Sequence, residues 1–147
     1  MNYRLNYRAG RLHGLSESFY IDGTRRQRTD YFENRRHGLQ EEYHPNGRLE
    51  RQIEFKRGVE HGSFVQLDQQ GQQLETGRFV FRLREGVWEE RWPNGHLRER
   101  ATYLDGRREG DVEVFHGNGR PAGGICFTRG VPQDFDKPWF MPLLKDG

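Results

Sequence analysis

The sequence predicts an all-β fold, an elongated antiparallel β-meander built from 24-residue β-hairpin repeats with a C-terminal capping tail. The first observation is a glycine that recurs every 24 residues without an insertion, at Gly14, Gly38, Gly62, Gly86 and Gly110. The second is an aromatic residue with the same period, at Tyr7, Tyr31, Phe55, Phe79, Tyr103 and Phe127. The third is an alternation of apolar and polar residues between the glycines. That alternation is typical of a strand with one buried face.

A second set of glycines follows the first by nine residues, at Gly23, Gly47, Gly71, Gly95 and Gly119. The tetrapeptides at 44–47 (HPNG) and 92–95 (WPNG) are typical hairpin turns, in which glycine supplies a positive φ. A further turn is expected three residues after each aromatic, as in 56–58 and 104–106. We therefore expect every repeat glycine to belong to a turn.

The strand between two turns has one apolar and one charged side. Leu49, Ile53 and Phe55 alternate with glutamates and Gln52, and Leu97, Ala101 and Tyr103 occupy the same positions two units later. Period-2 alternation puts these apolar residues on one face of the sheet. We expect Phe55, Phe79 and Tyr103 to form a stacked internal ladder of rings.

The third unit departs from the pattern. Arg82 stands where Gly58 and Gly106 are expected to adopt a positive φ, a conformation that arginine tolerates poorly. Glutamines replace charged residues in this unit, and an apolar run follows at 79–81. We expect a bulge or an altered turn there.

The repeat array covers residues 1–131, with one strand before the unit that begins at Gly14. Residues 132–147 contain three prolines together with Trp139 and Phe140, and prolines do not fit a regular central strand. Because the last repeat of a stack needs a cover, this tail is expected to be a cap. A partner-binding peptide is the alternative.

Composition limits the function. Apolar residues make up 32% of the chain and charged residues 31%, and 21 of the 24 basic residues are arginines mixed with acids. This mixture argues against nucleic acid as a partner and makes anionic lipid the weaker alternative to protein. Cys126 is the one cysteine, and the first ten residues lack the apolar stretch of an export signal. A cytoplasmic location is expected, and a periplasmic one stays open if a signal has been removed.

No catalytic or metal-binding group is expected, and no cofactor. His13, His37 and His61 occupy equivalent positions two strands apart, roughly 10 Å from one another, whereas metal ligands share one ion. Neighbouring glutamates such as Glu41 and Glu42 point to opposite faces of a strand and cannot act as an acid–base pair. We expect a protein that is not an enzyme.

A broad, rigid and polar sheet suggests a partner-binding surface, for which tryptophan, tyrosine and arginine are the usual anchors. Trp88, Arg91 and Trp92 are larger or more polar than most of their repeat equivalents, although Trp88 could equally be a packing residue. The candidate partner-binding residues are Trp88, Arg91, Trp92, Tyr43, His44 and Phe64.

The unit resembles the MORN-repeat variant family of bacteria, a group often described as YwqK-like antitoxins. The resemblance is carried by residues 38–49 (GLQEEYHPNGRL) and 86–97 (GVWEERWPNGHL), and by Tyr103, Gly106 and Gly110 in the spacing Y-x-x-G-x-x-x-G. It implies an antitoxin or immunity protein that neutralises a cognate bacterial toxin or secreted effector by direct binding. The alternative that it implies is a scaffold that binds anionic lipid headgroups at a membrane surface.

Overall fold

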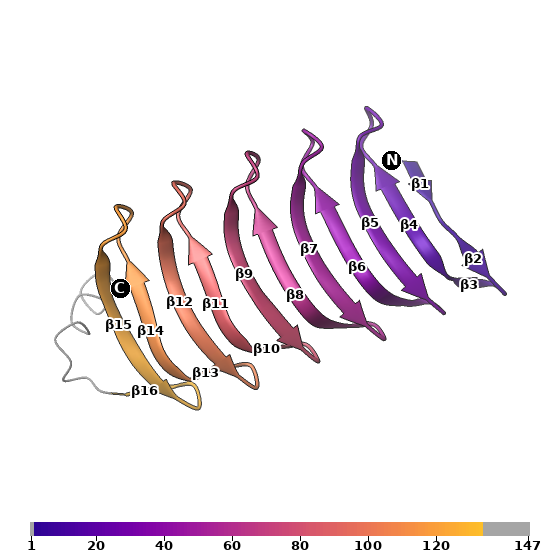
Figure 1. Ribbon diagram of the computed structural model, residues 1–147. Helices are drawn as coiled ribbons and strands as arrows, with labels where there is room; N and C mark the ends of the chain where they lie inside the picture. Colours follow the sequence, from indigo (N-terminus) through magenta and orange to yellow (C-terminus); the bar gives the residue numbers. More distant parts are fainter. Residues whose placement is uncertain (1, 134–147) are drawn as a thin grey trace.

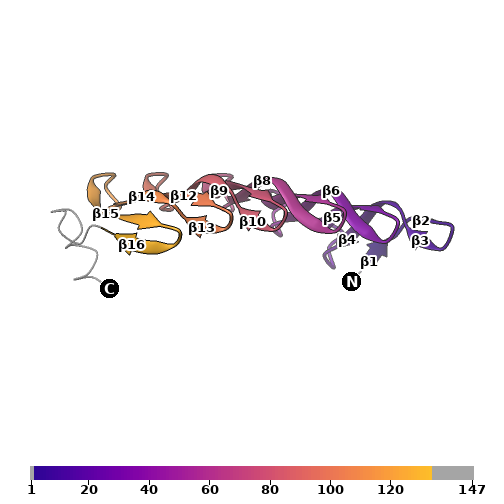
Figure 2. The ribbon, with the colours of Figure 1, turned by 90° about the horizontal axis from the view of Figure 1, so that it is seen from below.

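The computed structural model describes residues 2–133, and every regular element within them is a β-strand. Figure 1 shows hairpins that lie side by side in sequence order, and Figure 2 shows that the array is a single layer. The first strands are β1 (Asn2–Arg4), β2 (Tyr7–Arg8), β3 (Arg11–Leu12), β4 (Gly14–Phe19), β5 (Arg25–Phe32), β6 (Arg35–Tyr43), β7 (Leu49–Lys56) and β8 (Val59–Leu67). The later strands are β9 (Gln73–Val80), β10 (Leu83–Arg84), β11 (Gly86–Arg91), β12 (Leu97–Leu104), β13 (Arg107–Arg108), β14 (Gly110–Phe115), β15 (Pro121–Thr128) and β16 (Val131–Gln133).

Fourteen of these strands form one antiparallel sheet, and β2 and β3 form a separate pair. Hydrogen-bonded neighbours follow one another along the chain, so the predicted all-β meander of hairpins is confirmed. The described chain contains no helix long and apolar enough to cross a membrane. β16 crosses the expected boundary at residue 131, and the rest of the expected cap, from residue 134 onward, lies outside the described residues.

The first set of repeat glycines lies within strands, so the assignment of every repeat glycine to a turn was wrong. At Gly62 the register shifts: Phe55 pairs with Glu60 but Ile53 pairs with Phe64, so one strand carries two more residues than its partner. Gly62 has a φ of 124° at this bulge. A bulge needs the same backbone freedom as a turn, which is why glycine recurs there.

The turns that follow each aromatic residue have positive φ at two successive residues, the geometry of a type I′ hairpin. Arg57 and Gly58 have φ of 52° and 87°, and Phe81 and Arg82 have 45° and 72°. The turn of the third unit is therefore the same as the others, and its bulge is also shared with them. The expected bulge is therefore present but is not particular to this unit, whereas the expected altered turn was wrong, because Arg82 adopts the positive φ that glycine has in the other units.

The apolar core is one row of side chains across the sheet. The pairing register brings Ile53 next to Phe64 and Trp88 next to Ala101, and all four are buried. Phe55 is buried beside this row, which confirms the predicted apolar face. The predicted stacked ladder of Phe55, Phe79 and Tyr103 was wrong. Phe79 and Tyr103 each contact the ring of Trp88 rather than each other, with centroids 5.0 and 6.4 Å from it.

The same row is polar near the N-terminal end. Ser16 pairs with Thr29, and Thr29 pairs with Gln40, which in turn pairs with Ile53. Ser16 and Thr29 are buried, and the Ser16 hydroxyl has no hydrogen-bond partner within the described chain. The apolar stabilisation is therefore concentrated in the middle of the array and declines toward β4 and β5.

Hydrogen bonds at the lower turns in Figure 1 join each hairpin to the next. The amide of Gly58 donates to the carbonyl of Arg36 at 2.8 Å, and its counterparts do the same along the sheet. A side chain supplies a second bond: the amide of Arg57 donates to Nδ1 of His37 at 3.2 Å. Glu109 replaces histidine at the equivalent position and accepts from the amide of Arg129 at 2.8 Å.

Candidate functional site

Two of the six candidate residues are core residues. Trp88 is 4% exposed; its ring lies 5.3 Å from that of Phe64, and its indole nitrogen donates to the carbonyl of Arg78. The guanidinium of Arg84 covers it at 4.2 Å from the ring centroid. Phe64 is also buried. A partner cannot reach either ring without disrupting the sheet, so we remove both from the candidate surface.

The space for Trp88 comes from Gly77, which the sequence reasoning overlooked. A Cβ atom at Gly77 would overlap the indole ring of Trp88. Gly77 belongs to neither repeat set, and its equivalents Thr29, Ile53 and Ala101 all carry side chains. A comparison of the units at this position would have shown a glycine paired with an unusually large neighbour.

The other four candidates lie along the edge that carries the longer turns, at the upper side of Figure 1. Tyr43 ends β6, with His44 after it, and Arg91 ends β11, with Trp92 after it. All four are half-buried. They form two pairs in equivalent positions two units apart, which is roughly 20 Å at the usual strand spacing. The structure keeps the pairs on one edge and does not gather them into one cluster.

Each pair also connects its hairpin to the next one. The indole nitrogen of Trp92 donates to the carbonyl of Phe115 at 3.1 Å, and Nε2 of His44 lies 3.0 Å from the carbonyl of Leu67. Tyr20, at the equivalent position of an earlier unit, donates to the carbonyl of Tyr43 at 2.7 Å. These side chains are therefore structural as well as partly exposed, and a test of binding must separate the two roles.

Charged neighbours fix the orientation of these side chains. The guanidinium of Arg98 lies 4.8 Å from the ring centroid of Trp92, and Arg91 donates to the carbonyl of Gly95 at 3.1 Å. The Tyr43 hydroxyl donates to Glu41 at 2.9 Å. Burial raises the pKa of Tyr43 above its usual value, and Glu41 adds to this shift. Tyr43 thus stays a neutral hydrogen-bond donor.

The face opposite the core carries a row of mixed charge. Arg100 pairs across the sheet with Glu89 and Glu113, at 3.0 and 3.4 Å. Near the other end of the sheet, Arg28 is paired in register with Glu41. Opposite charges therefore face one another across this row, as the mixture of acids and arginines in the sequence indicates.

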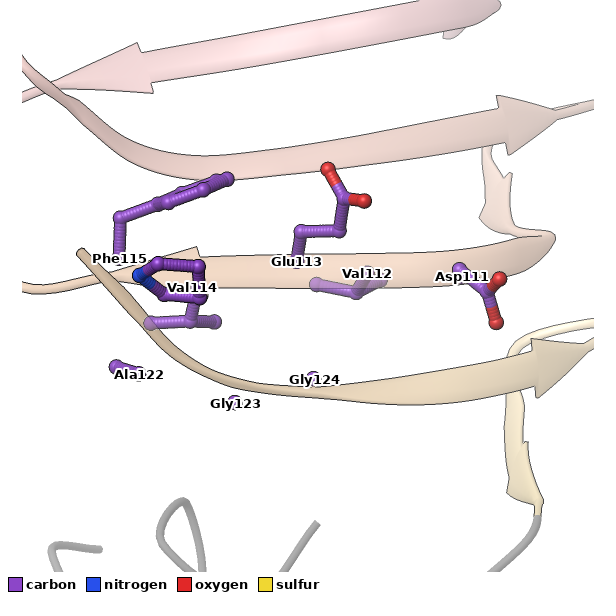
Figure 3. Close-up of a pocket in the computed structure, with 9 residues that line it drawn as sticks. Asp111, Val112, Glu113, Val114, Phe115, Ala122, Gly123 and Gly124 are labelled. Carbon is purple, nitrogen blue, oxygen red and sulfur yellow. The ribbon is translucent and has the colours of Figure 1, made fainter. Parts of the chain in front are cut away.

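A hollow of about 430 Å³ lies between β14 and β15, where the last hairpin lacks side chains. Figure 3 shows Gly123 and Gly124 on β15, bare of side chains, opposite Glu113 and Val114 on β14. In the preceding unit the same two positions carry Glu99 and Arg100. The hollow is thus a gap in the repeat pattern, and none of the six candidate residues lies in it.

The described residues contain no group of three histidine, cysteine, aspartate or glutamate side chains that could hold a metal ion. His37 and His61 accept hydrogen bonds from turn amides, as does Glu85 at the next equivalent position. These two histidines lie in strands β6 and β8 rather than in turns, and their rings bind the turn amides of the next hairpin. The absence of catalytic activity and of a cofactor stays a prediction.

The model of the family described as MORN repeat variant matches residues 36–57 and 84–105. Each match covers the strands of one hairpin, β6 and β7 in the first and β10 to β12 in the second. The chain thus contains two MORN-variant repeats. The period of 24 residues and the shared turns and bulges extend the same hairpin architecture to the units between and beside these two MORN repeats.

Other comparisons add little to this MORN-repeat assignment. A search of curated proteins finds no match. Among solved structures, a mutant of S. aureus TarM is similar, with 8% identity and a TM-score of 0.43. The match covers 74% of this chain and 21% of the TarM chain, so the chain spans about a fifth of that protein. A likeness at this TM-score supports no statement about function.

Proposed function

We propose that this MORN-repeat protein is an antitoxin or immunity protein that neutralises a bacterial toxin or secreted effector by direct binding. One observation carries the proposal: a single-layer sheet leaves its mixed-charge face open, with Arg91, Trp92, Tyr43 and His44 along one edge. Mixed charge suits a specific protein partner, because each sign must meet its opposite and wrong partners are repelled. Half-exposed tryptophan, tyrosine and arginine are the usual anchors of such an interface.

The alternative partner is a membrane surface with anionic headgroups. The row of Glu89, Arg100 and Glu113 argues against it, because its carboxylates would be repelled by the lipid phosphates. Salt separates the two partners. Binding to vesicles would collapse as ionic strength rises, whereas a protein interface with a desolvated centre would weaken only modestly.

The direct test is co-expression with the product of the neighbouring gene. We expect that product to arrest growth when expressed alone, and we expect this protein to restore growth and to co-purify with it in a fixed ratio. If the product is toxic and the protein neither restores growth nor co-purifies, the antitoxin proposal is wrong.

Variants then locate the interface. Trp92→His should keep the hydrogen bond to the next hairpin, as His44 does, while removing the indole surface. We expect Trp92→His and Arg91→Ala each to weaken the complex by about tenfold or more, a typical loss at an interface anchor. The comparison is Arg100→Ala, which removes a charge from the same mixed-charge face but away from this edge and should weaken the complex less. Equal effects of all three variants would place the contact away from this edge.

A further inference from the structure

A second hollow lies at the other long edge of the sheet, beside the short turns near the N-terminal end. It measures about 500 Å³ and is lined by Arg11, Phe32, Glu33, Arg35, His37 and Arg57. A neighbouring hollow of about 350 Å³ shares Phe32 and adds Arg8 and His13. Phe32 thus stands between two depressions whose charged walls consist mainly of arginine. We call these two depressions the arginine hollow.

Phe32 is a surface residue held in a fixed position. Its side chain is 52% exposed, and its ring lies 5.0 Å from the ring of His13 and 6.0 Å from that of His37. The equivalent residues Lys56 and Leu104 carry no aromatic ring. The equivalents Lys56 and Leu104 are exposed as well, so it is the aromatic ring at this position, and not its exposure, that the repeat architecture leaves unexplained.

The arginine hollow also has more positive than negative charge. Arg35 and Arg57 are exposed, and no carboxylate within residues 2–133 lies within ion-pair distance of either guanidinium. Arg11 is 3.7 Å from Glu33, the one acid in the lining. Nδ1 of His37 accepts a hydrogen bond from the amide of Arg57. A neutral His37 therefore carries its proton on Nε2 and can donate a hydrogen bond from that atom.

We propose that the arginine hollow binds an acidic segment of a protein partner, with carboxylates on Arg35 and Arg57 and an apolar or aromatic residue against Phe32. The planar guanidinium binds a carboxylate in two-point fashion, and a half-exposed ring beside it contributes apolar contact. This inference rests on the proposed function, because it names the chemistry of the protein that is bound. It adds a site on the opposite edge from Arg91 and Trp92.

The surroundings favour a protein segment over other anions. The same edge continues with exposed Phe81, Leu83 and Leu104, which a run of phosphates would leave without apolar contacts. The ring of Phe32 is flanked by two histidines, so it is not a free platform for a stacked base. An acidic segment with apolar residues matches both the charge of the hollow and the apolar character of the edge beyond it.

The chain supplies a matched control. Arg107 and Arg129 are the equivalents of Arg35 and Arg57 three units later, and all four arginines are exposed. At that turn Leu104 replaces Phe32 and Glu109 replaces His37, with the same hydrogen bond to the turn amide. A double charge reversal at either turn thus changes net charge and local geometry in the same way, but only one of the two turns carries the hollow.

The experiment measures fluorescence anisotropy of a labelled peptide of alternating glutamate and tyrosine, against a peptide with glutamine in place of glutamate. We expect the acidic peptide to bind the full chain and the glutamine peptide to bind at least about tenfold more weakly. The double variant Arg35→Glu with Arg57→Glu should bind the acidic peptide about tenfold or more weakly. The control double variant, Arg107→Glu with Arg129→Glu, should lose less than about twofold in affinity. Circular dichroism checks that both double variants stay folded.

Phe32→Ala tests the apolar contact. It should lower the affinity for the acidic peptide by about threefold to tenfold without changing the preference for the glutamate peptide over the glutamine peptide. Equal losses from the two charge-reversal pairs would mean attraction by net charge alone and would overturn the proposal. So would tighter, Arg35-dependent binding of phosphatidylserine vesicles or inorganic phosphate than of the peptide. Because no toxin is present, peptide binding can succeed where growth rescue fails, and the two proposals fail separately.

Discussion

Gly77 has no side chain, and the indole ring of Trp88 occupies the space that a side chain would need. Gly77→Ala should therefore destabilise the protein by about 1–3 kcal/mol, because the ring must move in a packed row. Gly117→Ala is the control, since a Cβ atom there meets nothing within 4 Å and the backbone is not in the left-handed region. Urea unfolding measures both. Similar midpoints for the two variants would show that the row repacks freely.

Arg82 has a φ of 72°, in a turn where the equivalent residues Gly58 and Gly106 have 87° and 80°. Its amide hydrogen bond to the carbonyl of Glu60 does not depend on its side chain. Arg82→Gly should thus be neutral or stabilising by up to about 1 kcal/mol. Thermal or urea unfolding tests this, with Gly106→Ala as the opposite change that should destabilise. A clear loss of stability in Arg82→Gly would mean that the arginine side chain contributes more than its backbone costs.

Single residues were predictable where the period constrains them. Ile53, Phe55 and Ala101 were correctly assigned to the apolar face by alternation alone. Trp88 was left open between core and surface, because its size suits both and only the neighbouring Gly77 decides. Phe64 was chosen as a surface residue, yet the register places it directly beside Ile53. Register across strands, rather than pattern along one strand, settles such cases.

The hairpin-to-hairpin connection at the short turns depends on an acceptor side chain, which is histidine in two units and glutamate in two others. Glu109→Leu should destabilise the protein by about 1 kcal/mol, because the amide of Arg129 loses its partner. Glu109→His should lose less, since His37 and His61 have the same role. Hydrogen exchange at the Arg129 amide gives a direct measurement. An unchanged exchange rate in Glu109→Leu would mean that this bond is not formed in solution.

The elements were predictable in kind but not in detail. The fixed spacing of turn residues predicted the hairpins, and the uninterrupted period predicted that they follow one another in sequence order. The bulges at the repeat glycines were not predicted as a shared feature of every unit, because a glycine with positive φ looks the same in sequence whether it ends a strand or kinks one. The connections through Trp92 and His44 were missed for a different reason. They join residues 23 positions apart, and no local pattern marks such a pair.

The whole array has an uneven distribution of stability. The buried rings lie between β7 and β12, whereas the row at β4 and β5 is formed by Ser16 and Thr29. Because each unit contacts only its neighbours, stability should vary along the chain. Hydrogen–deuterium exchange should show the strongest protection in β7, β8, β9 and β11 and the weakest in β1 and β4. Equal protection throughout would mean that the array unfolds as one cooperative unit.

The bonds between hairpins reach only from one unit to the next, and this has a mechanical consequence. If the two ends are pulled apart, the load passes through one hairpin boundary after another, and no second layer shares it. Each unit that gives way would release 24 residues, roughly 80 Å of chain at full extension. The force curve should therefore be a sawtooth with nearly equal spacing between its peaks. The force peak for the unit that contains Trp88 should be the highest, because its packed rings need the largest force to separate.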